Sequence, residues 1–295
     1  MRATVMTKKN SEVSVFQSKH RRELIAKSLA YLILIIASIV ILIPILWMFS
    51  TALKPLDEVY IFPPTWIPKN FMWSNFKEAL TFLPFGIYFK NTITITLFSM
   101  VGQLLSSSIV AYGFARLKAN FRDILFMLVL ATMMLPSQVT MIPLFILFKT
   151  LGWVDTFKPL IIPNFFGNAF FIFLLRQFFM TIPTELDDAA KIDGCGYFGI
   201  YQKILLPLIK PALATIAIFS FMWNWNDFMS PLIYLNSSEK LTVALGLSRF
   251  TGVYGGTAWN LLMAASLVVV LPCIVLFFFA QRYFIQGIVM TGLKG

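Results

Sequence analysis

Long hydrophobic runs alternate with short polar segments along most of the chain. An α-helix needs roughly 20 apolar residues to cross the hydrocarbon core of a bilayer. Six runs approach or exceed this length, so the pattern predicts an all-α membrane protein with six transmembrane helices. The predicted spans are residues 29–49, 91–114, 124–148, 160–180, 212–235 and 259–284.

Prolines fall inside several of these spans. A proline kinks a membrane helix, and the kink is tolerated where neighbouring helices or water satisfy the freed carbonyl groups. We therefore expect kinked helices that still span the membrane. The prolines concerned are Pro44, Pro136, Pro143, Pro231 and Pro272.

The spans divide the rest of the chain into an arm, two longer loops and a tail. Residues 1–28 are polar and basic and precede the transmembrane domain, 29–284. Residues 51–90 form an outer loop, whose prolines and tryptophans indicate an ordered segment lying along the membrane interface. A polar loop at 181–210 and a tail at 285–295 are both predicted on the cytosolic side.

Composition supports the membrane assignment and explains the positive charge. Hydrophobic residues make up 58% of the 295 and charged residues 13%, whereas a soluble domain carries about 25% charged residues. The net charge of +11 could indicate nucleic-acid binding, but its distribution favours membrane sidedness. With a cytosolic N-terminus, 16 of the 24 Lys and Arg residues are cytosolic and 8 lie outside. Six spans also return the C-terminus to the cytosol.

The first hydrophobic run is expected to remain as an anchor. It is too long for a signal-peptide core, and its flank lacks a small-x-small cleavage site. The two cysteines do not suggest a disulfide, because Cys195 lies in the cytosolic loop and Cys273 inside the last span.

The loop at 181–210 contains an acidic, helix-forming segment in an otherwise hydrophobic chain. Pro183 ends the preceding helix. Thr184 can then cap a new helix, with Asp187 three residues later in a variant of the capping box. Gly194 is a natural stop for that helix.

One side of this short helix is small and apolar. Leu186, Ala189 and Ala190 lie at helical spacing, and the acids flank them. A helix of this kind suits insertion into a groove of a soluble partner. The alternative, a helix on the lipid surface, would carry Lys and Arg on its polar side rather than acids.

The spacing in the loop resembles the cytoplasmic loop of ABC importer permeases. The family pattern is Glu-Ala-Ala, three residues, Gly, nine residues, then Ile-x-Leu-Pro. Here Asp-Ala-Ala at 188–190 is followed by Gly194, and Ile204 and Pro207 complete the pattern. The Asp in place of Glu keeps the charge and shortens the side chain by one methylene.

Further segments carry the same resemblance over most of the chain from about residue 40. The set is similar to MalG-type permease subunits of oligosaccharide-importing ABC transporters. Only the tail departs from the pattern, with larger residues than usual at 288–291. The matching segments are Trp-Met at 47–48, Leu-Lys-Pro at 53–55, Arg-Gln-Phe-Phe at 176–179, Trp-Asn-Trp-Asn-Asp-Phe at 223–228 and the ending from Arg282 to Gly295.

The resemblance implies the six-helix type I importer permease fold in the cytoplasmic membrane. It implies a second related permease, two ABC ATPase subunits and an extracytoplasmic sugar-binding protein as partners. ATP and Mg²⁺ would bind in the ATPase subunits, and this chain would hold no cofactor. The loop would carry the closing of the ATPase dimer to the spans. The residues implied in ATPase contact are Glu185, Asp188, Ala189, Ala190, Gly194, Ile204 and Pro207 in the loop, and Gln286, Gly287 and Lys294 in the tail.

Two polar groups are candidates for the translocation path. A stripe of small polar residues on the second span would either let helices pack closely or line the path, where hydroxyl and amide groups suit a sugar. An acid among tryptophans and asparagines near the outer end of the fifth span is a functional candidate or part of an interface anchor. The candidates are Thr92, Thr96, Ser99 and Gln103, with Ser106 completing the stripe, and Asn224, Asn226 and Asp227.

Arg176 ends the fourth predicted span on the cytosolic side. Its guanidinium would snorkel to the interface or form a salt bridge with Glu185 or Asp188 that positions the loop.

The sequence contains no sign of catalysis or of a metal site. His20 is the only histidine, and the chain has no Gly-x4-Gly-Lys-Ser/Thr phosphate loop. We therefore expect a transport subunit rather than an enzyme. The alternatives are an ABC permease for a non-sugar solute such as glycerol phosphate, a stand-alone secondary transporter, which an internal repeat would favour, and a membrane scaffold that binds ATPases without a substrate.

Overall fold

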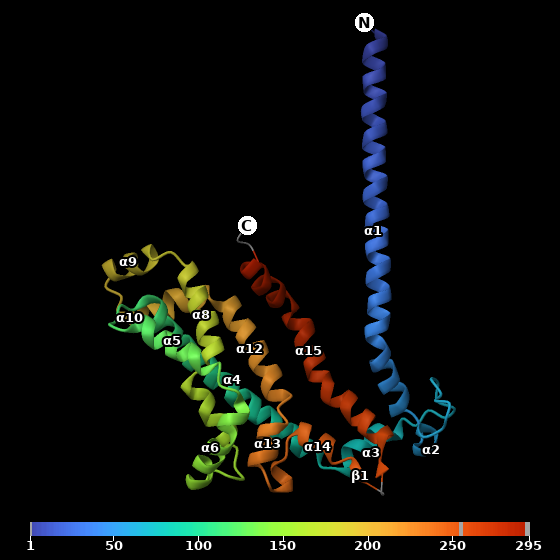
Figure 1. The fold of residues 1–295 in the computed structure, drawn as a ribbon, viewed down its shortest axis with the longest axis vertical. Helices are drawn as coiled ribbons and strands as arrows, with labels where there is room; N and C mark the ends of the chain where they lie inside the picture. The colour runs from blue at the N-terminus through green and yellow to red at the C-terminus, as the bar shows by residue number, and fades with distance from the viewer. Residues whose placement is uncertain (1, 254–255, 293–295) are drawn as a thin grey trace.

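The computed structural model describes the backbone of residues 2–253 and 256–292 and the side chains of residues 23–251 and 256–281. This part of the chain is helical almost throughout (Figure 1). Its strands form one antiparallel hairpin, in which β1 (Thr251–Val253) pairs with β2 (Gly256–Thr257). The prediction of an all-α fold is confirmed.

Four helical segments of the described chain are long and apolar enough to cross a membrane. They correspond to the first, second, fourth and sixth predicted spans. The segments are Glu23–Ala52 within α1 (Arg2–Ala52), α4 (Phe85–Arg116), Lys158–Thr181, which comprises α7 (Lys158–Ile161), η1 (Ile162–Phe166) and α8 (Ala169–Thr181), and Trp259–Gln281 within α15 (Trp259–Gly292).

The third predicted span is two helices rather than one. α5 (Arg122–Thr132) and α6 (Ser137–Thr150) meet at 94°. Pro136 stands at the break and has extended backbone angles. Proline lacks an N–H for the helical ladder and disfavours helical backbone in the residue before it. The expectation of a single kinked helix is therefore wrong here.

The fifth predicted span is preceded by a bend and interrupted in its outer part. The helices Tyr197–Leu208 and Lys210–Trp225 (α12) meet at 78° beside Ile209. α12 ends at Trp225, and a separate short helix, α13 (Met229–Tyr234), covers the rest of the predicted span. Counting each bent pair as one span gives up to six spans in the described chain.

α1 stands apart from the other helices over most of its length (Figure 1). Its apolar side chains from Leu29 to Leu46 are exposed, whereas Ser50 and Ala52 at its end are buried. The helix begins at Arg2, so no break in secondary structure separates the basic segment from the first span.

The loop 51–90 is held by buried polar side chains and contains α2 (Leu56–Val59) and α3 (Ser74–Phe82). Asn75 donates hydrogen bonds to the carbonyls of Ala52 at 2.9 Å and Lys54 at 2.8 Å. The buried carboxylate of Glu58 accepts one from Thr65 at 3.0 Å.

α4 is the central helix of the fold and packs against α8, η1 and α12. We call the end of the molecule that carries the loop 181–210 the inner end, and the opposite end the outer end. Two clusters of buried side chains lie toward these two ends. The inner cluster includes Tyr112, Phe171, Leu175, Phe179 and Leu205, and the outer cluster includes Phe85, Tyr88, Trp225, Val243 of α14 (Val243–Ser248) and Phe250.

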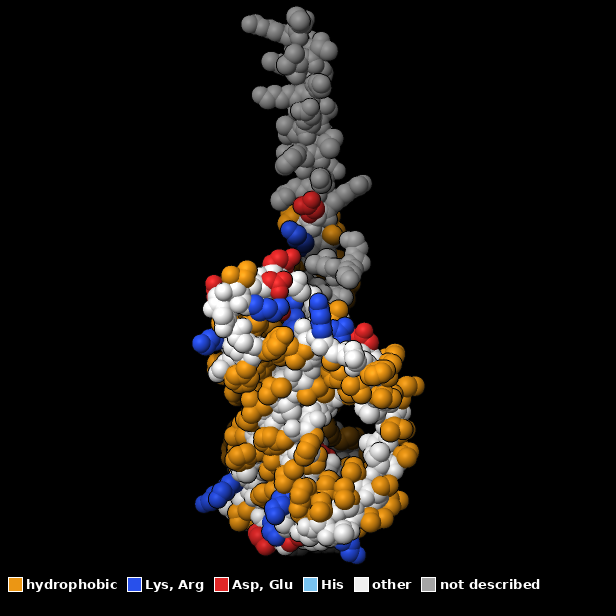
Figure 2. Space-filling view, turned by 90° about the vertical axis from the view of Figure 1, so that its left-hand side faces the viewer, with side chains coloured by type: hydrophobic (Ala, Val, Ile, Leu, Met, Phe, Trp, Pro, Cys, Tyr) orange, Lys and Arg blue, Asp and Glu red, His pale blue; other side chains and the backbone are white. Residues whose placement is uncertain are grey.

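The surface divides in the same way. Figure 2 shows Lys, Arg, Asp and Glu side chains gathered toward the two ends of the helical body, with a hydrophobic band between them. This arrangement matches a chain whose middle lies in lipid and whose ends lie in water.

Candidate functional site

The predicted loop helix is present as α9 (Glu185–Ile192), at the inner end of the molecule. Acids occupy its first turn, where the helix dipole favours them. The predicted capping box is wrong, because Thr184 makes no side-chain capping bond and has helical backbone angles. Asp187 turns inward instead and is only 7% exposed.

The apolar residues of α9 do not share one exposed face. Ala190 is 4% exposed and belongs to the inner cluster, so it supports α9 from within the chain. Leu186 and Ala189 are exposed together with Glu185 and Asp188. The surface that a partner could reach is therefore acidic at its edges and carries a small side chain, Ala189, between them.

α9 ends as the sequence predicts. Gly194 has a φ of +81°, a left-handed conformation that costs other residues roughly 1–2 kcal/mol. The N–H of Cys195 donates to the carbonyl of Ala190 at 2.9 Å and that of Gly194 to Lys191 at 3.0 Å. A Cβ added at Gly194 would meet no atom within 4 Å, so backbone conformation alone explains the glycine there.

The rest of the loop returns the chain to the fifth span through α10 (Tyr197–Gly199), a π-helical turn η2 (Ile200–Leu205) and α11 (Leu206–Leu208). Ile204 is half-buried against the inner cluster. Pro207 is exposed in the first turn of α11, where a missing N–H is tolerated.

The charged residues around the loop pair differently from the expectation for Arg176. Its guanidinium lies 3.8 Å from Asp123 and 4.2 Å from the ring centre of Phe126, and not beside Glu185 or Asp188. Asp188 instead accepts a hydrogen bond from Lys191 at 2.8 Å. That bond lowers the pKa of Asp188 below its ordinary value.

The tail candidates lie beyond the side chains that the structure describes. The backbone of α15 continues through Gln286 and Gly287 to Gly292. Lys294 lies outside the described residues.

A cavity of about 290 Å³ lies beside the outer half of α4, between α6, η1, α12 and α13. Thr92, Asn224 and Asp227 line it, so the fold brings Thr92 of α4 together with two predicted path residues from the distant end of α12. Asn164 and Thr242 also line it and were not predicted. Asp227 is the one charged residue among the lining residues.

The remaining path candidates mostly serve packing. Thr96 is 1% exposed, Ser99 donates to the carbonyl of Leu160 at 3.0 Å, and Gln103 donates to Asn164. Phe165 completes this contact, since a Cβ added at Gly102 would lie 2.6 Å from its ring. The inner part of the stripe thus holds η1 against α4.

Ser106 and Asn226 also lie outside the cavity. Ser106 donates to the carbonyl of Gly102 at 2.7 Å and to that of Asn164 at 3.2 Å. Asn226 is exposed and donates to the carbonyl of Met222 at 2.8 Å, at the end of α12.

Polar contacts between the inner end of α4 and the loop were not predicted from the sequence. Ser108 bonds Tyr201 at 2.8 Å, and Tyr112 donates to the carbonyl of Tyr197 at 3.0 Å. Arg116 donates to the carbonyl of Ile182 at 2.6 Å and lies 3.6 Å from Asp187. Their spacing of four along the helix was the signal that could have found them.

Apolar spans around a largely neutral polar cavity, with an acidic helix exposed at the inner end, are typical of a membrane transport component. The described residues contain no group of three His, Cys, Asp or Glu side chains that could hold a metal. The chain belongs to the family of binding-protein-dependent transport system inner membrane components, whose model matches residues 103–290. It is a transport subunit rather than an enzyme, and its fold is that of the ABC importer permeases.

Relatives named after their substrates support this family assignment. The arabinooligosaccharides transport system permease protein AraQ of Bacillus subtilis is 37% identical over 88% of this chain and 92% of its own. A probable permease for starch degradation products, AmyC of Thermoanaerobacterium thermosulfurigenes, is 35% identical over 77% and 83%. The sn-glycerol-3-phosphate permease UgpE of Pectobacterium atrosepticum is 31% identical over 88% and 95%.

A solved structure shows the same fold. It is a bacterial ABC transporter involved in the import of the acidic polysaccharide alginate, and it matches 90% of this chain and 98% of its own with a TM-score of 0.79 and 25% identity. The prediction of a type I importer permease is confirmed by this match together with the family model.

Proposed function

We propose that this chain is one permease subunit of an ATP-driven importer that moves a sugar or oligosaccharide across the cytoplasmic membrane. The cavity beside α4 carries the proposal. Its polar lining is mainly hydroxyl and amide groups, as in Thr92, Asn164 and Asn224. These groups both donate and accept hydrogen bonds, as sugar hydroxyls require.

The single charge in the lining favours a neutral sugar over an anionic solute. A phosphate or uronate is bound by Arg, Lys or backbone N–H donors, and the lining offers only the carboxylate of Asp227 as a charged group. Repulsion from that carboxylate would oppose glycerol phosphate, the alternative that a relative's name raises.

The inner end of the chain would face the energy source. We assign one ABC ATPase subunit to the exposed side of α9. A second ATPase subunit, a second related permease and an extracytoplasmic sugar-binding protein belong to the same assembly, and the ATPase subunits bind ATP and Mg²⁺. The outward face of Glu185, Asp188 and Ala189 supports this assignment. The described ends of α1 and α15 lie on the same side as α9 (Figure 1), which supports two cytosolic termini.

ATP-dependent uptake by the complete transporter in proteoliposomes tests the proposal. We expect uptake of a labelled neutral oligosaccharide, such as an arabinooligosaccharide or a maltooligosaccharide, and none of sn-glycerol 3-phosphate. Asp227→Ala should reduce sugar uptake, and Asn226→Ala, outside the cavity, should leave it unchanged. Transport of glycerol phosphate, or equal uptake by both variants, would contradict the proposed substrate class and path.

A further inference from the structure

α4 contacts the loop that carries α9 at its inner end and the segment after the fifth span at its outer end. It is one unbroken helix of 32 residues without an internal proline, so it spans about 48 Å. The helix pairs at 122–150 and 197–225, in contrast, are bent by 94° and 78°. A continuous helix transmits a displacement along its axis, whereas a bent pair can absorb one at the break.

At its outer end, α4 holds the segment that follows the fifth span. Asn91 donates to the carbonyls of Glu239 at 2.8 Å and Leu241 at 3.0 Å. Thr92 accepts a hydrogen bond from the N–H of Val243 at 3.0 Å. These bonds tie the wall of the cavity, including Thr242, to the first turns of the helix.

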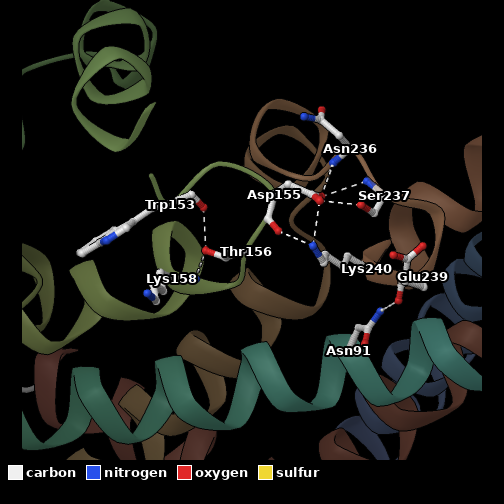
Figure 3. A network of polar contacts seen from close by, with 9 residues as sticks. All are labelled: Asn91, Trp153, Asp155, Thr156, Lys158, Asn236, Ser237, Glu239 and Lys240. Atoms are coloured by element: carbon white, nitrogen blue, oxygen red, sulfur yellow. Dashed lines mark hydrogen bonds and ion pairs between the residues drawn. The ribbon is translucent and has the colours of Figure 1, made fainter. Parts of the chain in front are cut away.

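The same segment is fixed to a second loop, as Figure 3 shows. Asp155 accepts hydrogen bonds from the N–H groups of Asn236 and Ser237, each at 2.9 Å, and from Lys240 at 2.8 Å. Asp155 therefore joins the loop before α7 to η3 (Ser238–Lys240). A displacement of Asn91 would therefore move η3 and the loop at Asp155 together.

At its inner end, α4 holds α9 through a buried ion pair. The side chains of Arg116 and Asp187 are 4% and 10% exposed, and the Arg116 Nε lies 3.6 Å from the Asp187 Oδ2. Arg116 also bonds the carbonyl of Ile182, just before α9. The Arg116 guanidinium thus contacts both the Ile182 carbonyl before α9 and an acid in the first turn of α9.

The ion pair has room to tighten. The Arg116 Nε and the Asp187 Oδ1 are buried and have no hydrogen-bond partner among the described residues. A charge-assisted N–H···O bond has a length of about 2.7–2.9 Å, so a shift of α9 by less than about 1 Å would convert the ion pair into a direct bond. A contact that differs between two positions of α9 can bias the equilibrium between them.

We propose that α4 carries the displacement of α9 to the outer wall of the cavity, and that Arg116 is the positioning residue that attaches α9 to it. This inference rests on the proposed docking of an ATPase on α9. Asn91 is the corresponding attachment at the outer end, about 37 Å away along the helix axis.

The test measures the state of the outer wall without needing the substrate. A single cysteine is placed at Thr242 of the complete transporter, with Cys195 and Cys273 replaced by serine. Its maleimide labelling rate is compared in the nucleotide-free and the ATP–vanadate-trapped complex. We expect the two rates to differ by about 5–150-fold, the range of typical coupling between sites.

Arg116→Met and Asn91→Leu should each bring the ratio of the two labelling rates close to one, because each removes one attachment of α4. Arg116→Lys, which keeps the charge, should restore part of it. Lys118→Met removes an exposed cation two residues away and should leave the ratio unchanged. A normal ratio in both Arg116→Met and Asn91→Leu would overturn the inference.

Two further variants separate positioning from stability and from docking. Arg116→Met with Asp187→Leu replaces the buried pair by apolar residues, which is often tolerated. A ratio that returns to normal in this double variant would show a merely structural pair and overturn the inference. No nucleotide dependence in the unsubstituted complex would overturn the inference, whereas an Ala189→Glu variant that still binds the ATPase would contradict the proposed docking on α9 instead.

Discussion

The end of α9 allows a prediction in which backbone conformation is the only variable. Gly194 and Gly196 are two residues apart, and a Cβ at either would meet no atom within 4 Å. Gly194 has a φ of +81° and Gly196 a φ of −74°. Gly194→Ala should therefore destabilise the end of α9 by roughly 1–2 kcal/mol, whereas Gly196→Ala should be neutral or stabilise it by roughly 0.4–1 kcal/mol.

Limited trypsin digestion measures this difference. Cleavage after Lys191, in the last turn of α9, needs local opening of the helix. When opening is fast relative to cleavage, the rate follows the open population, so 1–2 kcal/mol corresponds to a roughly 5–30-fold faster cut in Gly194→Ala. The Gly196→Ala chain should be cut no faster than the unsubstituted chain. Equal cleavage of the two variants would refute the assignment of strain to Gly194.

Other variants test the remaining contacts. Ala189→Glu should weaken ATPase binding in pull-down assays by at least about a hundredfold, through overlap and an unpaired buried charge, and undiminished binding would contradict the docking face. A reporter fused at Lys294 should be active only in the cytosol, and external activity would contradict the topology. Gly102→Ala should destabilise the purified chain to heat by about 1–3 kcal/mol because of the ring that packs there, whereas Gly113→Ala has open space and should not; equal melting would contradict the close packing. The hydrogen bonds to Asp155 hold its pKa well below the ordinary value, so their stabilisation is present above about pH 4 and is lost only at lower pH; hydrogen exchange in the loop it holds, corrected for intrinsic rates, should show constant protection from pH 5 to 8.

The sequence predicted the features that depend on composition and local conformation. Hydrophobic run length located the spans, and Gly194 was correctly assigned to a helix end because only the local backbone decides its conformation. The bend at Pro136 was expected only as a kink, since a proline does not reveal whether neighbouring contacts continue the helix or separate its halves.

Features that depend on contacts between distant segments were harder to predict. Asp187 was read as part of a cap, but Arg116, 71 positions earlier in the sequence, draws it into the interior. Asn224 and Asp227 were predicted for the path, whereas Asn164 was missed because η1 is packed beside them only in the folded chain. Helical periodicity shows which residues share a face, and not which segment that face meets.

The break between α5 and α6 should affect how long this subunit persists in the membrane before it is assembled. α5 has 11 residues and is about 16 Å long, so the break falls near the middle of a hydrocarbon core about 30 Å thick. Non-helical backbone at that depth is tolerated only where protein or water covers it, yet Met134 at the break is 83% exposed. An orphan subunit should thus be short-lived, which would make the cell's supply of its partner the limit on how much of this chain accumulates.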